Sequence, residues 1–269
     1  MPRFERYIGI DYSGAAAPET PLPGIRVYTA RHATRITEVR PDRDRRRHWS
    51  RADLFTWLLR QLESDDAPAL IGIDHGLSFP RSYFNDNGID ANWPAFLDDF
   101  AVHWPTDGEG VTVESIRRRE RGQAHLRTGA ATQRRRTEQA TRAKSVFHFD
   151  VPGSVAKSTH AGIPWIRRLI HRVESLHAWP FDGWDPPTSV HCIAEVYPAL
   201  WSGRFPRRGR TADQHDAYAV AASLRALDLD GRLDEVFSPS IDDETRRDAA
   251  VEGWILGVTE SPMLSAHDA

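Results

Sequence analysis

The sequence predicts an α/β fold, and three observations support that prediction. First, short and uniformly apolar runs such as Ala69–Asp74 are typical of strands that are buried on both faces of a sheet. Second, the segments between these runs repeat apolar residues at helical spacing, most clearly at 164–176. Third, 269 residues, 40% of them hydrophobic, are enough for one large α/β domain or two small ones, and no repeat or linker marks a second domain. We therefore expect a single domain over residues 1–269.

Five strands and six helices are expected along the chain. The strands combine apolar or β-branched residues with flanking turn signals, at 6–11, 25–29, 35–40, 69–74 and 189–196. The first helix begins after Ser50 as its N-cap, and the others are expected at 93–100, 113–121, 164–176, 211–227 and 242–255. Pro164 suits the first turn of its helix, and Thr211 with Gln214 forms a capping box. An arginine-rich helical insertion, at about 85–188, separates the fourth and fifth strands.

Composition excludes several classes of protein. No run of about 18 apolar residues occurs, and the first residues lack the apolar stretch of a secretion signal. The single cysteine, Cys192, cannot form an intramolecular disulfide or a zinc site of the Cys-x-x-Cys kind. We expect a cytoplasmic protein without a membrane span.

Basic residues gather in one stretch of an otherwise slightly acidic chain. The formal net charge is −3, but ten basic residues and two acidic ones lie between Arg117 and Lys144. This balance predicts a phosphate-binding patch, with Arg134, Arg135, Arg136 and the more distant Lys157 as the candidate contacts. The alternative is that these arginines form a solvated surface.

Acidic residues stand where predicted strands and helices begin or end. Asp11 and Asp74 each follow Ile-Gly-Ile, Glu195 lies near the end of the fifth strand, and Asp213 and Asp216 lie three apart in the first turns of a helix. Taken singly, each has a simpler explanation, because aspartate favours helix N-termini and turns. Taken together, carboxylates in apolar surroundings repel one another unless they are ligated, and a pair of Mg²⁺ or Mn²⁺ ions would relieve that repulsion.

These motifs carry a resemblance to a known family. The sequence Ile-Gly-Ile-Asp-Tyr-Ser-Gly contains Asp11, Ile-Asp-His-Gly-Leu-Ser-Phe-Pro contains Asp74, and Asp-Gln-His-Asp-Ala-Tyr-Ala-Val-Ala begins at Asp213. With the segments 152–157, 162–164, 195–199 and 252–255, they resemble the DUF429 family of predicted nucleases, which have a ribonuclease H-like fold. The helix of Asp213 is also similar to the last acidic helix of RuvC-type resolvases, although Gln214 and His215 stand where Asp-Ala-x-Asp-Ala is common.

The resemblance implies a fold and a set of functional residues. The fold is a mixed five-stranded ribonuclease H-like sheet flanked by helices. Asp11, Asp74, Asp213 and Asp216 are implied as metal ligands and catalytic residues, with Glu195 as an outer member of the same cluster. Two metals in such a site clamp the attacking and leaving oxygens of a phosphodiester.

Other catalytic patterns are incomplete. A phosphate loop would need glycines at Val151 and Ala156, and the chain has neither a His-Glu-x-x-His nor a Gly-x-Ser-x-Gly motif. His75 and His215 adjoin the proposed ligands and are candidates for proton transfer, although a lone histidine is more often structural.

The leading hypothesis is therefore an Mg²⁺- or Mn²⁺-dependent nuclease or a related phosphoryl-transfer enzyme, a hydrolase whose partner is DNA or RNA. Two alternatives stay open. One is a catalytically inactive module that binds nucleic acid or a protein in the same cleft. The other is an ATP-using relative of the actin-like and sugar kinases, which share an Asp-bearing first strand.

Overall fold

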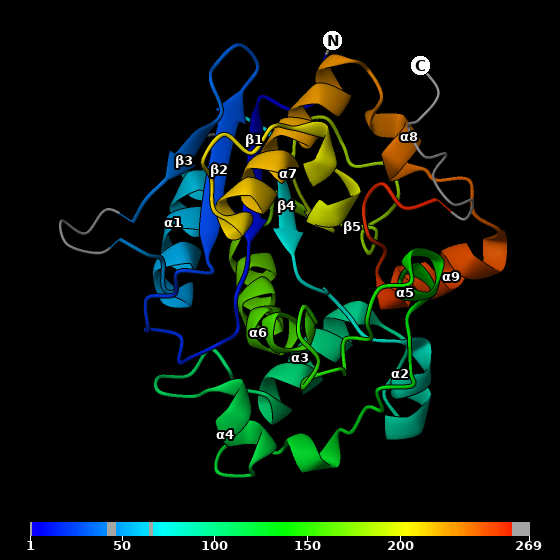
Figure 1. Ribbon diagram of the computed structural model, residues 1–269. Coiled ribbons are helices and arrows are strands. Elements are labelled where there is room, and N and C mark those ends of the chain that lie inside the picture. The colour runs from blue at the N-terminus through cyan, green and yellow to red at the C-terminus, as the bar shows by residue number, and fades with distance from the viewer. Residues whose placement is uncertain (1, 42–46, 65–66, 260–269) are drawn as a thin grey trace.

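A computed structural model describes residues 2–41, 47–64 and 67–259, and it contains one mixed sheet (Figure 1). The strands are β1 Arg6–Asp11, β2 Arg26–Arg31, β3 Thr37–Val39, β4 Ala69–Asp74, β5 Leu176–Trp179 and β6 His191–Glu195. Their order in the sheet is β3-β2-β1-β4-β6-β5. β2 runs antiparallel to β1 and β3, whereas β1, β4, β6 and β5 are parallel to one another.

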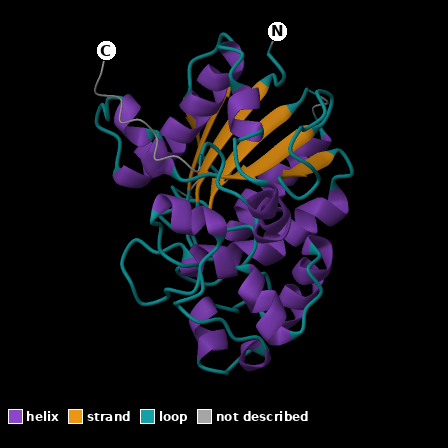
Figure 2. Ribbon diagram, turned by 90° about the vertical axis from the view of Figure 1, so that its right-hand side faces the viewer, coloured by secondary structure: helices purple, strands orange, loops and turns teal. Residues whose placement is uncertain are grey.

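The helices cover both faces of the sheet and extend beyond the carboxyl ends of its parallel strands (Figures 1 and 2). The α-helices are α1 Arg51–Glu63, α2 Arg81–Asn87, α3 Trp93–His103, α4 Val113–Arg117, α5 Arg136–Thr141, α6 Ala156–Arg172, α7 Ala212–Leu229, α8 Leu233–Phe237 and α9 Asp243–Glu252. Short 3₁₀ helices are η1 Ala124–Leu126, η2 Pro198–Leu200 and η3 Ser202–Arg204. None of the helices in the described ranges combines the length and the apolar character that crossing a membrane requires.

The α/β prediction is confirmed, and both strands that end in aspartate have the predicted bounds. The sheet nevertheless has six strands rather than five. The missed strand is β5, which lies inside the expected insertion and pairs with β6 at the edge of the sheet. Its four residues leave too short a pattern to separate it from the helix that precedes it.

The predicted caps are present, whereas several helix boundaries differ. The Ser50 side chain accepts a hydrogen bond from Asp53 N, and Thr211 and Gln214 form the expected capping box. α6 begins at Ala156, so Pro164 lies inside the helix and not in its first turn. Proline removes the N–H that would bond to the carbonyl four residues earlier, at His160. The buried Thr106 hydroxyl donates to that carbonyl at 2.7 Å, which explains how the helix continues through the proline.

The sheet separates two apolar layers. Alternate residues of the central strands face α1, α3 and α6 on one side, including Ile8, Ile71 and Ile193. The intervening residues face α7 and the C-terminal segment on the other side, including Tyr7, Leu70 and Cys192. This alternation fixes the face to which each strand-end carboxylate points.

α7 lies very close to β1 and β4, because both strands have a glycine beneath it. A Cβ atom on Gly9 would overlap the Ala217 carbonyl oxygen and would lie 2.6 Å from Ala221 N. A Cβ on Gly72 would lie 2.6 Å from Val220 Cγ1. The glycines therefore let the alanine-rich face of α7 sit directly on the strands, which brings the first turns of α7 to the strand ends.

Candidate functional site

Asp11 and Asp74 lie side by side at the carboxyl ends of two parallel strands. The strands pair residue by residue, from Arg6 opposite Ala69 to Asp11 opposite Asp74. By alternation, Asp11 is on the face of Gly9 and Asp74 is on the face of Gly72, which is the face that α7 covers. Both carboxylates are partly buried and point to the same layer.

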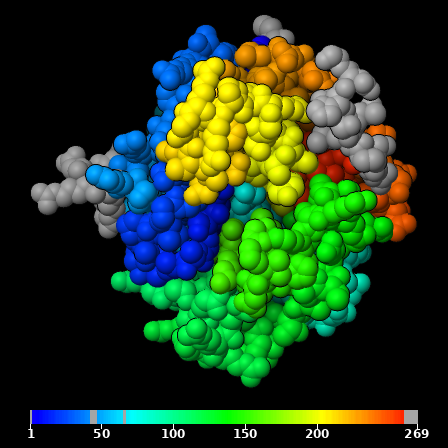
Figure 3. All heavy atoms as spheres, viewed as in Figure 1, coloured from blue at the N-terminus to red at the C-terminus, as the bar shows by residue number. Residues whose placement is uncertain are grey.

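The first turns of α7 bring two more carboxylates to this edge of the sheet. Asp213 and Asp216 are partly buried, and both interact electrostatically with Asp11. A Cβ on Gly24, in the loop that leads into β2, would lie 3.9 Å from Asp213 Oδ2. In Figure 3 the segment after β1 (blue), α7 (yellow) and the long insertion (green) meet around a small cyan surface of the β4 region. We call Asp11, Asp74, Asp213 and Asp216 the aspartate cluster.

Burial and mutual repulsion disfavour the charged forms of the carboxylates in the aspartate cluster. Burial raises the pKa of Asp11 to about 9, and repulsion by Asp74, Asp213 and Asp216 adds to that effect, whereas Arg26 lowers it. Burial also raises the pKa of Asp74 to about 8, with Asp216 and Glu195 as the repelling charges. The pKa of Asp216 is raised by burial and by Asp213. Without a cation, these groups therefore compete for protons at neutral pH.

The donor chemistry of the cluster fits a hard divalent cation. Carboxylate oxygens are the ligands that Mg²⁺ and Mn²⁺ prefer, and a cation would relieve the repulsion that raises the pKa values. No three or more His, Cys, Asp or Glu side chains in the described ranges form a group that could hold a metal ion by themselves. Magnesium is often bound through one or two carboxylates, with waters and substrate phosphates completing the shell.

Glu195 is near the cluster but faces the other way. It pairs with Ile73 in the sheet and alternates with Ile193, so it lies on the face opposite to Asp74. Both Glu195 oxygens accept hydrogen bonds from the Arg135 guanidinium at 2.6 Å, and Leu77 N donates to one of them. The resemblance implies Glu195 as an outer member of the acidic cluster; the structure instead gives it a bidentate, buried arginine partner.

Arg135 is buried and bound to two carboxylates, whereas the sequence predicts that it contacts phosphate. Its side chain is 1% exposed, and its Nε donates to Glu138 at 2.8 Å while its two terminal nitrogens bind Glu195. Interactions with Glu195 and Glu138 hold its pKa above the ordinary value against the opposing effect of burial. Arg135 is thus the centre of a buried Glu–Arg–Glu triad.

Most of the other predicted phosphate contacts also have acidic partners. Arg136 binds Glu244 and Asp248, and the Lys157 ammonium lies 2.7 Å from Glu114. Arg134 is partly exposed, and no side-chain hydrogen bond or ion pair engages it within the described ranges. Arg117 and Arg127 elsewhere in the same stretch bind Asp150 and Asp99. The stretch is therefore far less positive in the folded protein than along the sequence.

A small cavity beside Asp74 contains residues that the sequence analysis did not single out. It has a volume of about 130 Å³, and Arg142, Lys144 and Tyr197 line it together with Asp74 and Glu195. The Lys144 ammonium donates to the Pro152 carbonyl. Arg142 and Lys144 belong to the basic stretch, but only the folded chain distinguishes them from the arginines that have acidic partners.

A second group of basic residues forms a groove along α7, β2 and β3. The groove has a volume of about 520 Å³, and four arginines, two tyrosines and one glutamate contribute to its lining: Arg35, Arg208, Arg210, Arg225, Tyr28, Tyr218 and Glu38. None of the four arginines forms an ion pair with a carboxylate of the described residues. The Gln214 side chain donates to Glu38 at 3.0 Å, so the groove adjoins the turn of α7 that carries Asp213. We call it the arginine groove.

The two candidate proton-transfer histidines have structural contacts. His75 is buried beneath Tyr12, and its Nδ1 bonds to the Gly76 carbonyl; burial lowers its pKa to about 4. A Cβ on Gly162 of α6 would overlap the His75 ring. His215 Nε2 bonds to the Ser202 carbonyl, which joins α7 to η3. Each ring therefore holds a nearby backbone carbonyl in place by a hydrogen bond.

Comparison of the chain with protein-family models, with curated proteins and with solved structures gave no match.

Proposed function

We propose that the protein is a divalent-metal-dependent nuclease whose reaction takes place at the aspartate cluster. The observation that carries the proposal is the placement of Asp11 and Asp74 at one register of two parallel strands, under the acidic turns of α7. Burial and repulsion between neighbouring carboxylates raise the pKa values of both, and a bound cation would relieve that repulsion. The DUF429 resemblance, and with it a ribonuclease H-like fold, is part of this proposal and agrees with the order of strands from β3 to β4.

Mg²⁺ or Mn²⁺ would be held by Asp11 and Asp74, with Asp213 and Asp216 as the further ligands. When bound, the ions supply charge stabilisation for the phosphoryl group and for the attacking and leaving oxygens. The chain contributes a fixed set of carboxylates, because β1 and β4 hold two of them in register and the capping box of α7 fixes the turn that carries Asp213. In this proposal Glu195 has a structural role: by binding Arg135 it holds β6 in place beside β4, the strand that ends in Asp74.

The arginine groove is an argument for a substrate that carries many negative charges. Its four arginines lack carboxylate partners among the described residues, and its Glu38 accepts a hydrogen bond from Gln214, the residue after Asp213. If the phosphates of a nucleic-acid strand lay along the groove, the next nucleotides of that strand would lie close to Asp213. Tyr28 and Tyr218 offer aromatic faces in the same groove, as proteins that bind nucleic acids commonly do.

A binding module without catalysis is the second candidate. The observation in its favour is that no complete metal-binding group exists within the part of the chain that the structure describes. Such a module would bind nucleic acid through the arginine groove, with an affinity that falls steeply with salt and does not depend on metal.

The first test is calorimetric titration of Mn²⁺ into the wild-type protein and into Asp11→Asn and Asp74→Asn. Asp234→Asn is the matched control, because the Asp234 side chain on α8 is 80% exposed and, among the described residues, binds only Arg3. We expect binding in the wild type and in the control and a loss of at least tenfold in each site variant. If Mn²⁺ does not bind the wild type, the titration is repeated with a thio-substituted, uncleavable oligonucleotide present, since phosphate can complete such a shell.

The second test measures cleavage of labelled single- and double-stranded DNA and RNA in Mg²⁺ or Mn²⁺. We expect Asp11→Asn to abolish cleavage while the circular dichroism spectrum stays unchanged. Equal rates in the wild type and Asp11→Asn would refute the assignment of the site. Salt-dependent binding without turnover on any of these substrates would favour the binding module.

A further inference from the structure

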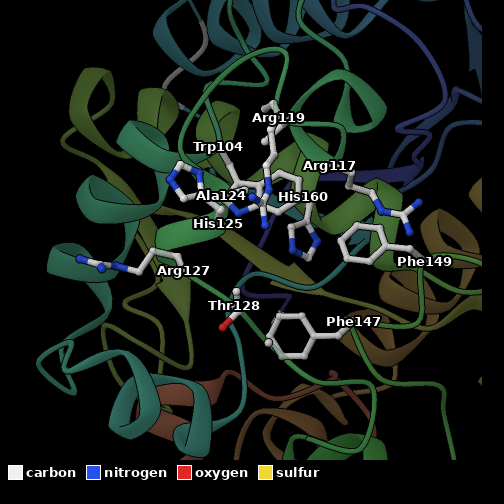
Figure 4. Close-up of a pocket in the computed structure, with 12 residues that line it drawn as sticks. Trp104, Arg117, Arg119, Ala124, His125, Arg127, Thr128, Phe147, Phe149 and His160 are labelled. Atoms are coloured by element: carbon white, nitrogen blue, oxygen red, sulfur yellow. The ribbon is translucent and has the colours of Figure 1, made fainter.

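A second pocket lies in the insertion, with no lining residue in common with the cavity beside Asp74. It has a volume of about 240 Å³, below the ~300–1,000 Å³ typical of sites for drug-sized ligands. Figure 4 shows Trp104, Phe147, Phe149 and His160 around it, with Arg117 and Arg127 on opposite sides of the view. The pocket therefore suits one flat ring system with polar substituents at its edge. We call it the aromatic pocket.

The walls of the aromatic pocket are rigid aromatic rings. The ring centres of Trp104 and Phe149 are each 4.5 Å from that of His160, and the planes of Trp104 and Phe149 differ by 7°. The backbone of Gly129 lies against Phe147, because a Cβ there would overlap the phenyl ring. Flat rings held in this way provide stacking surfaces for another aromatic ring.

His160 supplies a hydrogen-bond acceptor inside the pocket. The side chain is 1% exposed, and burial lowers its pKa to about 3, so the imidazole is neutral. Nδ1 lies 2.8 Å from the Ala156 carbonyl and must carry the proton, because a carbonyl only accepts. Nε2 is then an acceptor, and it has no hydrogen-bond partner within residues 2–41, 47–64 and 67–259. A ligand with an N–H group at the edge of its ring would satisfy it.

One arginine at the rim of the pocket is available to bind an anion. Arg117 binds Glu114 and Asp150, and Arg127 binds Asp99 through two hydrogen bonds. Arg119 differs, because no hydrogen bond or ion pair engages its side chain among the described residues. Its backbone has a φ of 61°, in the left-handed region that non-glycine residues seldom adopt. Arg119 is therefore an exposed charge on a sharply turned segment beside an aromatic cavity.

We infer that the aromatic pocket binds one nucleotide unit, with the base among the aromatic rings and its phosphate at Arg119. A nucleobase supplies a flat ring for stacking and N–H groups for His160 Nε2, and its phosphate complements the rim. The inference goes beyond the proposed function because it assigns a site that contains none of the aspartate cluster. If the protein acts on nucleic acid, this site selects unpaired nucleotides, since a base that is stacked and paired within a duplex cannot place its ring among these side chains.

The inference is tested by calorimetric titration of 5′-AMP and 5′-UMP into the full chain in the presence of EDTA. We expect saturable binding of at least one of the two, at least tenfold weaker in Arg119→Gln. Arg118→Gln is the matched control, because Arg118 is exposed in the same stretch and does not line the pocket; its affinity should equal that of the wild type. Thr128→Trp, which fills the pocket from an exposed lining position, should abolish binding.

Two further measurements separate a nucleotide site from simpler ones. His160→Phe keeps the ring but removes Nε2, and we expect it to weaken binding without altering the circular dichroism spectrum; if it fails to fold, Arg119→Gln and Thr128→Trp decide. Ribose 5-phosphate and benzoate are the comparison ligands, and each should bind at least tenfold more weakly than the nucleotide. Equal binding of either, or no binding of both nucleotides, would overturn the inference. Because EDTA removes divalent metal and no cleavage is measured, failure here leaves the nuclease proposal untouched.

Discussion

Replacing Asp11 by asparagine should make the metal-free protein more stable. The wild-type carboxylate is partly buried beside Asp74 and the acidic turns of α7, which raises its pKa to about 9. Asparagine has nearly the same shape but carries no charge. The substitution therefore removes the repulsion while it leaves the packing of β1 and α7 unchanged.

The magnitude follows from the difference in pKa between the folded and unfolded states. An aspartate in the unfolded chain has a pKa of about 3.9, and each pKa unit corresponds to about 1.36 kcal/mol. Since the folded-state pKa is raised, Asp11 contributes its full stability below about pH 4 and loses it as the pH rises toward about 9. At pH 7 the loss reaches at most about 1.36 × (7 − 3.9), or about 4 kcal/mol. Because Asp11 is partly exposed to water, we expect Asp11→Asn to gain about 1–3 kcal/mol.

The assay is urea denaturation in EDTA at several values between pH 4 and 9, with each variant compared at equal ionic strength. The difference between Asp11→Asn and the wild type should grow with pH over this range and shrink when Mn²⁺ is added. Asp228→Asn is the matched control, because that carboxylate accepts hydrogen bonds from Arg3 N, Phe4 N and the Tyr7 hydroxyl. It should destabilise the protein by about 1–3 kcal/mol. If Asp11→Asn also destabilises the metal-free protein, the aspartate cluster is not a site of net repulsion.

Three further substitutions test the supports of the site. Arg135→Met leaves two buried carboxylates without their partner and should cost about 3–5 kcal/mol in urea denaturation; a cost below about 1 kcal/mol would show that the triad does not hold the insertion to β6. Gly9→Ala places a Cβ against the backbone of α7 and should cost about 1–3 kcal/mol and weaken Mn²⁺ binding, whereas Gly203→Ala, which meets no atom within 4 Å, should be neutral in both assays. Thr106→Val removes the donor to the carbonyl that Pro164 leaves unpaired and should cost about 1–3 kcal/mol. Part of that loss should return in the double variant with Pro164→Ala, and strict additivity would argue against the role of the hydroxyl.

The sequence predicts the two strands of the aspartate cluster because their signals are local. Ala69–Asp74 is a continuous apolar run that ends in a charge, and the capping box of α7 needs only residues three apart. β5 could not be recognised in this way, because a four-residue edge strand directly after an amphipathic helix has no pattern of its own. Its assignment depends on pairing with β6, which is a contact between distant parts of the chain.

The orientation of Glu195 was within reach of the sequence, whereas its partner was not. Strand alternation places Glu195 with Ile193 and therefore away from the face of Asp74, and the apolar residues of β6 already contain that information. That the guanidinium of Arg135 would meet it, 60 positions away in the chain, required the folded insertion. One carboxylate at a strand end thus supports the fold, while no arginine or lysine of the described residues forms an ion pair with its neighbours Asp11 and Asp74.

The same distinction applies to the arginines, and it changes where a polyanion is expected to bind. The stretch from Arg117 to Lys144 contains ten basic residues, yet acidic residues from α3, α9 and the loop before α6 neutralise much of their charge. The arginines of the groove come from separate segments, around Arg35, Arg208 and Arg225, and only the folded chain brings them together. Charge that is dense along the sequence attracts its own counter-charges during folding, because burying it unpaired is costly. Among the described residues, an arginine that lacks a carboxylate partner and also lines a groove or pocket is a candidate for binding phosphate, and the arginines of the groove beside α7 and Arg119 at the aromatic pocket meet both conditions.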